Sequence, residues 1–268
     1  MPVGVQLWTV KDELDRDFDG TLGRLAAIGY RRVEAAGLHG RTAEDFGAAV
    51  RRAGLVCDSA HVSMPDLEKD FEGRLFDARA LGLKYLVCSS PAPGRPLGPD
   101  SADWMSAMRR AMTLDDWRRN ARLMNPMAAA AAKAGVQFAY HNHTFDFAGY
   151  DGVVAYDELL RLTDPELVKM ELDIGWAVAG GRDPLELLHR HAGRIVLLHL
   201  KDLKRPPQAG EGPAPETVPV GQGVIAWRPV LRAAEAAGVL GAYVEQEPPF
   251  IPPALDALAA SYRYLRGL

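Results

Sequence analysis

Two hydrophobic patterns alternate along the whole chain: short apolar runs rich in β-prone residues, and longer segments whose apolar residues recur at helical spacing. About eight runs are typical of strands, over residues 3–8, 31–36, 55–62, 84–89, 136–141, 167–173, 194–200 and 241–246. Helical spacing is clear between the first two runs, where Phe18, Leu22, Leu25 and Ile28 recur close to one face. The alternation predicts βα units along the chain.

Glycine marks the ends of the expected helices. A helix, a glycine and then at once a strand recur as "AIGY", "RAGL", "ALGL", "KAGV", "HAGR" and "AAGV". Glycine ends a helix in a left-handed conformation that other residues adopt at a cost. About eight such units in 268 residues predict an α/β fold, a single (β/α)₈ TIM barrel domain over residues 1–268. A doubly wound open sheet is the alternative, although no G-x-G-x-x-G follows the first strand, as a dinucleotide-binding version requires.

Polar residues of one parity gather at the ends of these strands. Side chains alternate between the two faces of a strand, and the carboxyl ends of barrel strands share one rim. The residues with this placement are Gln6, Glu34, Ser59, His61, His141, His143, Glu171, Asp173, His199, Lys201, Glu245 and Glu247. Such a convergence of ionisable and ligand-type groups predicts a functional site at the barrel mouth.

The mixture of carboxylates and imidazoles favours a divalent metal, with Mn²⁺, Zn²⁺, Co²⁺ and Mg²⁺ all compatible. Asp173, His199 and Glu245 end three consecutive strands, so they are the expected ligands. The fourth ligand is expected from His141, His143 or Asp146. Asp173 has a second interpretation as the cap of the segment "IGWAVAGG", and His199 has one as a buried core histidine.

Composition narrows the classes of protein and partner. Hydrophobic residues make up 48% of the chain and the formal net charge is −4, which disfavours nucleic acid as a partner. Cys57 and Cys88 lie in apolar runs, as expected of reduced thiols in a cytoplasmic protein. No apolar stretch approaches the ~20 residues that cross a membrane. Two Pro- and Gly-rich loops, 89–104 and 204–223, follow strands and are expected to be either lids over the site or disordered insertions.

Several segments together resemble a known superfamily. "GVQLWTV", "IGYRRVEAAG", "SAHVS", "YHNHTFDF", "TDPELVKMELDIGW", "LLHLKD", "VGQG" and "YVEQE" occur in the same order as in the sugar phosphate isomerase/epimerase superfamily, the xylose isomerase-like TIM barrels. The resemblance implies a divalent-metal barrel acting on a sugar or keto-sugar, with a homodimer as a family-level expectation. It also implies that the family's aspartate, histidine and last glutamate ligands fall on Asp173, His199 and Glu245.

The sequence departs from the family pattern at three positions. Epimerases of this family carry a glutamate at the end of the fifth strand, where this chain has His141. The family commonly reads "YHNHDFEF", whereas this chain reads "YHNHTFDF", with Asp146 at the position of the glutamate. Asp146 is the family-based candidate for the fourth ligand. The acidic residue of "GxGxID" is replaced by Ala226.

The family resemblance implies an isomerase or epimerase that removes a proton next to a metal-bound carbonyl. Glu245 is the expected acid/base group, with His141 or His143 opposite it and with Lys201 and His61 polarising oxygens. Gln6, Glu34, His61 and Trp176 are expected to bind the substrate. The alternative is a metal-dependent lyase or dehydratase acting on a keto-sugar, keto-glycoside or keto-inositol.

Two other classes are less well supported. An endonuclease IV-like enzyme with three zinc ions is disfavoured by the net charge of −4 and by a total of seven histidines. A non-catalytic sugar-binding barrel is disfavoured because Asp173, His199 and Glu245 are all present.

Overall fold

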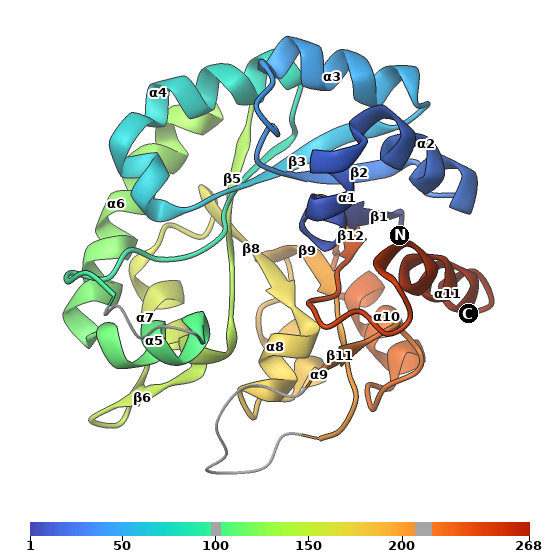
Figure 1. Ribbon diagram of the computed structural model, residues 1–268. Helices are drawn as coiled ribbons and strands as arrows, with labels where there is room; N and C mark the ends of the chain where they lie inside the picture. Colours follow the sequence, from blue (N-terminus) through green and yellow to red (C-terminus); the bar gives the residue numbers. More distant parts are fainter. Residues whose placement is uncertain (98–102, 207–215) are drawn as a thin grey trace.

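The computed structural model describes residues 1–97, 103–206 and 216–268. Strands of this described part close into a parallel barrel with the neighbour order β1-β12-β9-β8-β5-β4-β3-β2 (Figure 1). They are β1 (Val3–Gln6), β2 (Arg32–Ala36), β3 (Val56–Val62), β4 (Tyr85–Cys88), β5 (Gln137–His141), β8 (Val168–Asp173), β9 (Ile195–Leu200) and β12 (Gly241–Val244). This confirms the predicted (β/α)₈ barrel and excludes the open sheet.

Helices surround the barrel and cover its outer face (Figure 1). They are α1 (Lys11–Arg16), α2 (Phe18–Ile28), α3 (Ala43–Arg52), α4 (Met64–Leu81), α5 (Trp104–Ala111), α6 (Leu114–Lys133), α7 (Ala155–Leu162), α8 (Ile174–Ala179), α9 (Pro184–Arg190), α10 (Trp227–Ala236) and α11 (Ala254–Arg266). Short elements decorate the rim: the 3₁₀ helices η1 (Leu7–Val10) and η2 (Thr144–Phe147), and the paired strands β6 (Gly149–Tyr150) with β7 (Val153–Val154) and β10 (Asp202–Leu203) with β11 (Thr217–Val218).

The glycine signals in the sequence mark real helix ends. Gly82 follows α4 with φ of 71° and ψ of 33°, and its N–H bonds the carbonyl of Arg79. Gly135, Gly193 and Gly238 likewise have positive φ, and each lies shortly before a strand, at β5, β9 and β12 respectively. No helix in the described part of the chain has the length and apolarity needed to span a bilayer.

The barrel interior is divided into layers. Tyr85, Val87, Ala139, Leu197 and Tyr243 form one buried apolar cluster inside the barrel. At its amino-terminal end, the Tyr243 hydroxyl donates to Asp58 Oδ1 at 2.7 Å, and Arg32 pairs with the other Asp58 oxygen. The barrel is therefore filled and closed from below, which leaves the polar side chains of the opposite rim as its chemically active layer.

The two loops that we expected to act as lids, or to be disordered insertions, are described only in part. Residues 98–102 of the first and 207–215 of the second lie outside the described residues, so these alternatives stay predictions. The described end of the second loop is fixed by Asp202, which accepts hydrogen bonds from Leu203, Gly221, Gly223, Ile225 and the indole of Trp227. The "VGQG" segment is thus held against β10 by one carboxylate.

Gly4 provides a test of the interior packing. A Cβ on Gly4 would lie 2.7 Å from Tyr243 Cδ1 and 2.8 Å from the Arg32 carbonyl oxygen. We expect Gly4→Ala to destabilise the fold by about 1–3 kcal/mol, because overpacking forces the backbone to shift. Gly23→Ala in α2 is the matched control: its Cβ meets nothing within 4 Å, so it should stabilise by about 0.5–1 kcal/mol. Urea unfolding midpoints measure both, and equal signs would contradict the packing argument.

Candidate active site

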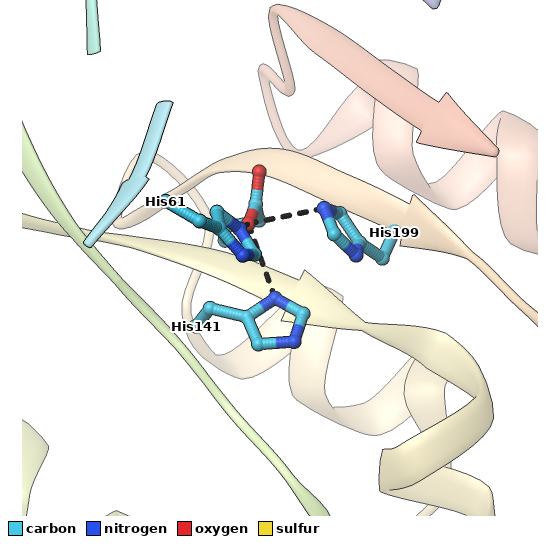
Figure 2. Close-up of side chains that lie close together, drawn as sticks. His61, His141 and His199 are labelled. Atoms are coloured by element: carbon cyan, nitrogen blue, oxygen red, sulfur yellow. Dashed lines mark hydrogen bonds and ion pairs between the residues drawn. The ribbon is translucent and has the colours of Figure 1, made fainter. Parts of the chain in front are cut away.

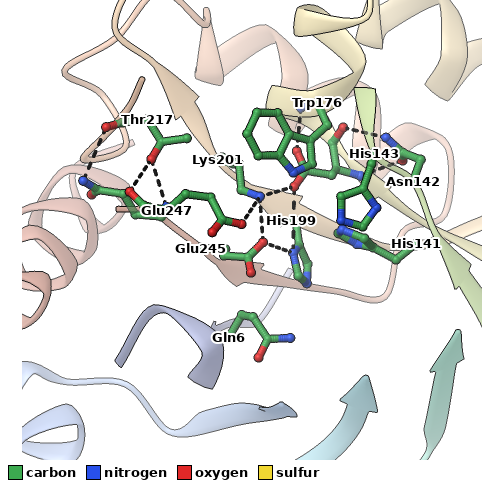
Figure 3. A network of polar contacts seen from close by, with 12 residues as sticks. Gln6, His141, Asn142, His143, Trp176, His199, Lys201, Thr217, Glu245 and Glu247 are labelled. Atoms are coloured by element: carbon green, nitrogen blue, oxygen red, sulfur yellow. Dashed lines mark hydrogen bonds and ion pairs between the residues drawn. The ribbon is translucent and has the colours of Figure 1, made fainter. Parts of the chain in front are cut away.

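His199 joins two carboxylates across the barrel mouth. Its Nδ1 lies 2.9 Å from Glu245 Oε2 (Figure 3). Its Nε2 lies 2.6 Å from Glu34 Oε2. Glu34 also accepts hydrogen bonds from Gln6 Nε2 at 2.7 Å and from the Ser59 hydroxyl. Burial disfavours a charged imidazole, but the surrounding carboxylates raise the pKa of His199 well above its ordinary value. Gln6 and Glu34, which we expected to bind substrate, lie in the fully buried layer on the Nε2 side of His199.

Glu171 is surrounded by imidazoles. Its Oε2 lies 2.6 Å from His61 Nε2, 3.1 Å from His141 Nδ1 and 3.2 Å from His199 Nε2 (Figure 2). Burial and the Glu34 carboxylate raise the pKa of Glu171 to about 7. His61 was predicted to bind substrate and His141 to act as an acid or base, and both therefore contact Glu171 inside the barrel. Strand parity had placed Glu171 one layer deeper than the rim.

Lys201 brings a buried ammonium to the same rim. Its Nζ lies 2.9 Å from Glu245 Oε2, 3.1 Å from Asp173 Oδ2 and 3.4 Å from Glu247 Oε1 (Figure 3). Burial disfavours the charge, but Asp173 and Glu245 raise the pKa of Lys201 further above its ordinary value. Burial likewise opposes ionisation of Glu245, yet Lys201 and His199 lower its pKa. Glu245 is therefore a carboxylate and Lys201 an ammonium, in direct contact.

Asp173 has one side-chain oxygen that caps a helix and one that faces the site. Its Oδ1 accepts the Trp176 N–H at 2.7 Å, which caps α8, while Oδ2 points to Lys201. The adjacent strand reinforces this position, because Asn142 Oδ1 accepts the Asp173 N–H at 3.0 Å. Asn142 is a site residue that the sequence analysis missed; its position between two ligand-type histidines was the available signal.

Asp146 does not join the other expected ligands, which corrects its assignment as the fourth ligand. Its Oδ1 accepts the Tyr140 hydroxyl at 2.6 Å, and its Oδ2 accepts the His143 N–H at 3.1 Å. Burial raises the pKa of Asp146 to about 8. The shorter aspartate thus closes the turn into η2, and it belongs to neither ligand-type group found among the described residues.

Aromatic residues line the rim. Burial and the nearby Lys201 charge lower the pKa of His143 to about 3, so its imidazole is neutral, and it stacks on Phe145. The Trp176 ring lies under Lys201 Nζ at 4.1 Å. Trp8 is 41% exposed and donates from its indole to Glu247 Oε2 at 2.9 Å. These side chains give the mouth faces on which a polyol ring can stack.

Two overlapping groups of side chains in the described structure have the donors and spacing for a metal ion. His141, Asp173, His199 and Glu245 form one, and His61, His141, Glu171 and His199 form the other. Buried side-chain atoms that find no hydrogen-bond partner among the described residues include Glu171 Oε1, His143 Nδ1 and the Trp176 indole nitrogen. Buried polar atoms are nearly always paired, so the residues present fit a cation and a polar ligand at this rim.

The sequence matches known proteins over almost its whole length. The family model described as xylose isomerase-like TIM barrel matches residues 22–268. An inosose dehydratase of Geobacillus thermodenitrificans is 29% identical, over 99% of this chain and 94% of the relative. An inosose dehydratase of Geobacillus kaustophilus is 27% identical over 69% of this chain, and that match spans 62%, less than two thirds, of the relative.

Solved structures share the fold. A sugar phosphate isomerase/epimerase of Parabacteroides distasonis superimposes with a TM-score of 0.75 at 25% identity, over 99% of this chain and 93% of the other. An IolI protein with a bound zinc atom has a TM-score of 0.73 at 16% identity, over 100% and 97% of the two chains, a level that shows the fold alone. The family match and the closed parallel barrel lead to one conclusion: this chain belongs to the xylose isomerase-like TIM barrel family.

Proposed function

We propose that this protein is a divalent-metal-dependent dehydratase that removes water from a keto-inositol or a similar keto-polyol. The observation that carries the proposal is the contact between Glu245 and Lys201, whose carboxylate and ammonium lie 2.9 Å apart at one side of the mouth. Loss of water from neighbouring carbons needs a base for the proton and an acid for the hydroxyl. When the base and the acid are in contact, the base can remove the proton and the acid can protonate the leaving hydroxyl on the same face of the substrate.

The end of β5 favours this reaction over the predicted isomerisation or epimerisation. An epimerase of this family pairs two carboxylates across the substrate, and here His141 stands at the second position. His141 is fully engaged inside the barrel, with its Nδ1 3.1 Å from Glu171 Oε2. The relatives named inosose dehydratase support the same choice, since an inosose is a keto-inositol.

Asp173, His199 and Glu245 are the proposed ligands of the ion, in agreement with the sequence-based expectation. A divalent ion would supply Lewis-acid polarisation of the substrate carbonyl. Glu245, which is ionised, takes the proton from the carbon next to the carbonyl, and the released electron pair forms the carbon–carbon double bond. The hydroxyl on the next carbon leaves with a proton from Lys201 as water. His143 and Trp176 are proposed to contact the substrate, while a cytoplasmic location and a homodimer stay predictions.

The activity can be tested directly with inosose. The metal-free protein is loaded separately with Mn²⁺, Co²⁺, Zn²⁺ or Mg²⁺ and incubated with inosose and with a panel of ketoses and aldoses. We expect a product that has lost one water by mass spectrometry and that absorbs in the ultraviolet as a conjugated carbonyl. A product of unchanged mass, with a shifted carbonyl or an inverted centre, would instead establish the isomerase or epimerase.

Lys201→Met separates the two proton transfers. Without the acid, water loss should fall about 10²–10⁴-fold, while Glu245 still exchanges the substrate proton with deuterium from solvent. Lys204→Met removes an exposed lysine that pairs with Glu216 at 2.7 Å outside the site, and it should leave both rates unchanged. Equal losses of exchange and of water elimination in Lys201→Met would show that Lys201 acts in binding and not as the acid.

Glu34→Gln tests whether Glu34 positions His199. The 2.6 Å contact of Glu34 with Nε2 leaves Nδ1 facing Asp173 and Glu245, where its lone pair would be available to a bound ion. We expect Mn²⁺ affinity, measured by equilibrium dialysis, to fall about 10–100-fold, with kcat at saturating metal much less affected. Glu44→Gln, an exposed change in α3, is the control. An unchanged Mn²⁺ affinity in Glu34→Gln would refute the positioning role.

A further inference from the structure

The group around Glu171 has more nitrogen donors than the proposed reaction uses. His61, His141 and His199 each bring a ring nitrogen within 3.2 Å of Glu171 Oε2, and the second oxygen of Glu171 has no hydrogen-bond partner among the described residues (Figure 2). Glu171 is fully buried and His141 is 2% exposed. For all three contacts to be hydrogen bonds, each of the three facing nitrogens has to carry a proton.

His199 belongs to the outer group. Its Nε2 has a closer acceptor in Glu34, at 2.6 Å, than in Glu171, at 3.2 Å. Its Nδ1 faces Glu245 at 2.9 Å and Asp173 at 3.9 Å. If the Nε2 proton is donated to Glu34, the lone pair of His199 is on Nδ1, which faces Glu245 and Asp173 in the outer group. The inner contacts that remain are those of His61 and His141 with Glu171.

We propose that His61 Nε2, His141 Nδ1 and the Glu171 carboxylate form a second divalent-metal position, deeper in the barrel than the ion held by Asp173, His199 and Glu245. His61 Nε2 and His141 Nδ1 lie 2.6 and 3.1 Å from the same carboxylate oxygen, and their rings are tilted by 59° with centroids 4.8 Å apart. Two imidazoles and one carboxylate from three different strands leave further coordination positions open. This division gives each ion its own three protein ligands, so neither His141 nor His199 has to bind two ions.

The donor types set the class of ion. Imidazole-rich sites bind Zn²⁺, Co²⁺ or Fe²⁺ in preference to Mg²⁺, which prefers oxygen ligands and keeps its water. The outer ligands are two carboxylates and one imidazole, which suit Mn²⁺ as well. The two positions are therefore expected to differ in selectivity, with the inner one restricted to metals that accept nitrogen ligands.

The excess of buried carboxylates in this region is a physical reason for an inner cation. Glu34, Glu171, Asp173 and Glu245 are at most 6% exposed and are opposed by the buried Lys201 ammonium, which leaves a formal charge of −3 while the histidines are neutral. One divalent ion in the outer group leaves net negative charge, with Glu34 and Glu171 in a layer where desolvated charges need compensation. Protons on His61 and His199 are the rival source of positive charge, and metal titration distinguishes them from a second ion.

Cobalt titration of the metal-free protein tests the proposal. Bound Co²⁺ is counted by equilibrium dialysis and its coordination is followed by visible absorption. We expect the wild type to bind about two Co²⁺ per chain, in accord with two sets of nitrogen and oxygen donors. Glu171→Gln and His61→Gln should each bind one and keep the outer-site spectrum. Asp173→Asn should also bind one, with the inner-site spectrum. His189→Gln, which removes an exposed histidine of α9, should still bind two, and circular dichroism checks that every variant is folded.

The outcomes separate this inference from the proposed function. A wild type that saturates with one Co²⁺, lost in Asp173→Asn and kept in both His61→Gln and Glu171→Gln, would overturn the inner position and leave the outer ion intact. A single Co²⁺ that is lost in His61→Gln but kept in Asp173→Asn would support the inner position and overturn the outer one. A folded wild type that binds no Co²⁺ would overturn both.

Discussion

The burial of charged groups at the carboxyl end of the barrel is the constraint on which the rest of this structure depends. Glu34, Glu171, Asp173 and Glu245 are all removed from water, and an isolated buried carboxylate is strongly destabilising. Imidazoles and one ammonium compensate them, with His199 between Glu34 and Glu245 at the centre. Buried ion pairs of this kind rarely add stability over an apolar core, which makes a role in binding or chemistry the better reason for them.

The barrel makes this concentration of charge possible. Gln6, Glu34, His61, His141, Glu171 and His199 come from six different strands, and Glu245 directly follows a seventh. A closed parallel sheet brings the carboxyl ends of these strands to one rim. Below them, the apolar layer around Leu197 and Tyr243 excludes water and fixes strand spacing. The rim is supported as well: Asn142 holds the backbone of Asp173, and Asp202 holds the segment after the second long loop. The ligand-type side chains therefore stand on a rigid frame.

The same frame can serve different reactions when a few rim residues change. In this chain the decisive residue is His141, at a position where an epimerase of the family has a carboxylate. The imidazole contacts Glu171 and leaves Glu245 without an opposing carboxylate partner, while the Lys201 ammonium lies 2.9 Å from Glu245. In the proposed dehydratase, the change from an opposed to an adjacent acid and base would change the reaction type without any change of fold.

The sequence by itself determined the topology, because hydrophobic period and helix-ending glycines are local signals that a strand and a helix each impose on their own residues. Strand parity also identified Asp173, His199, Lys201 and Glu245 as one rim, since alternation along a strand is fixed by its backbone. Contacts between strands were decided only by the tertiary structure. Asp146 has the right chemistry for a ligand, yet the Tyr140 hydroxyl and the His143 N–H bind both of its oxygens. Glu171 looked one layer too deep, and only the closed barrel placed His61 and His141 against it, because distances between residues 110 and 30 positions apart are set by strand register and barrel curvature.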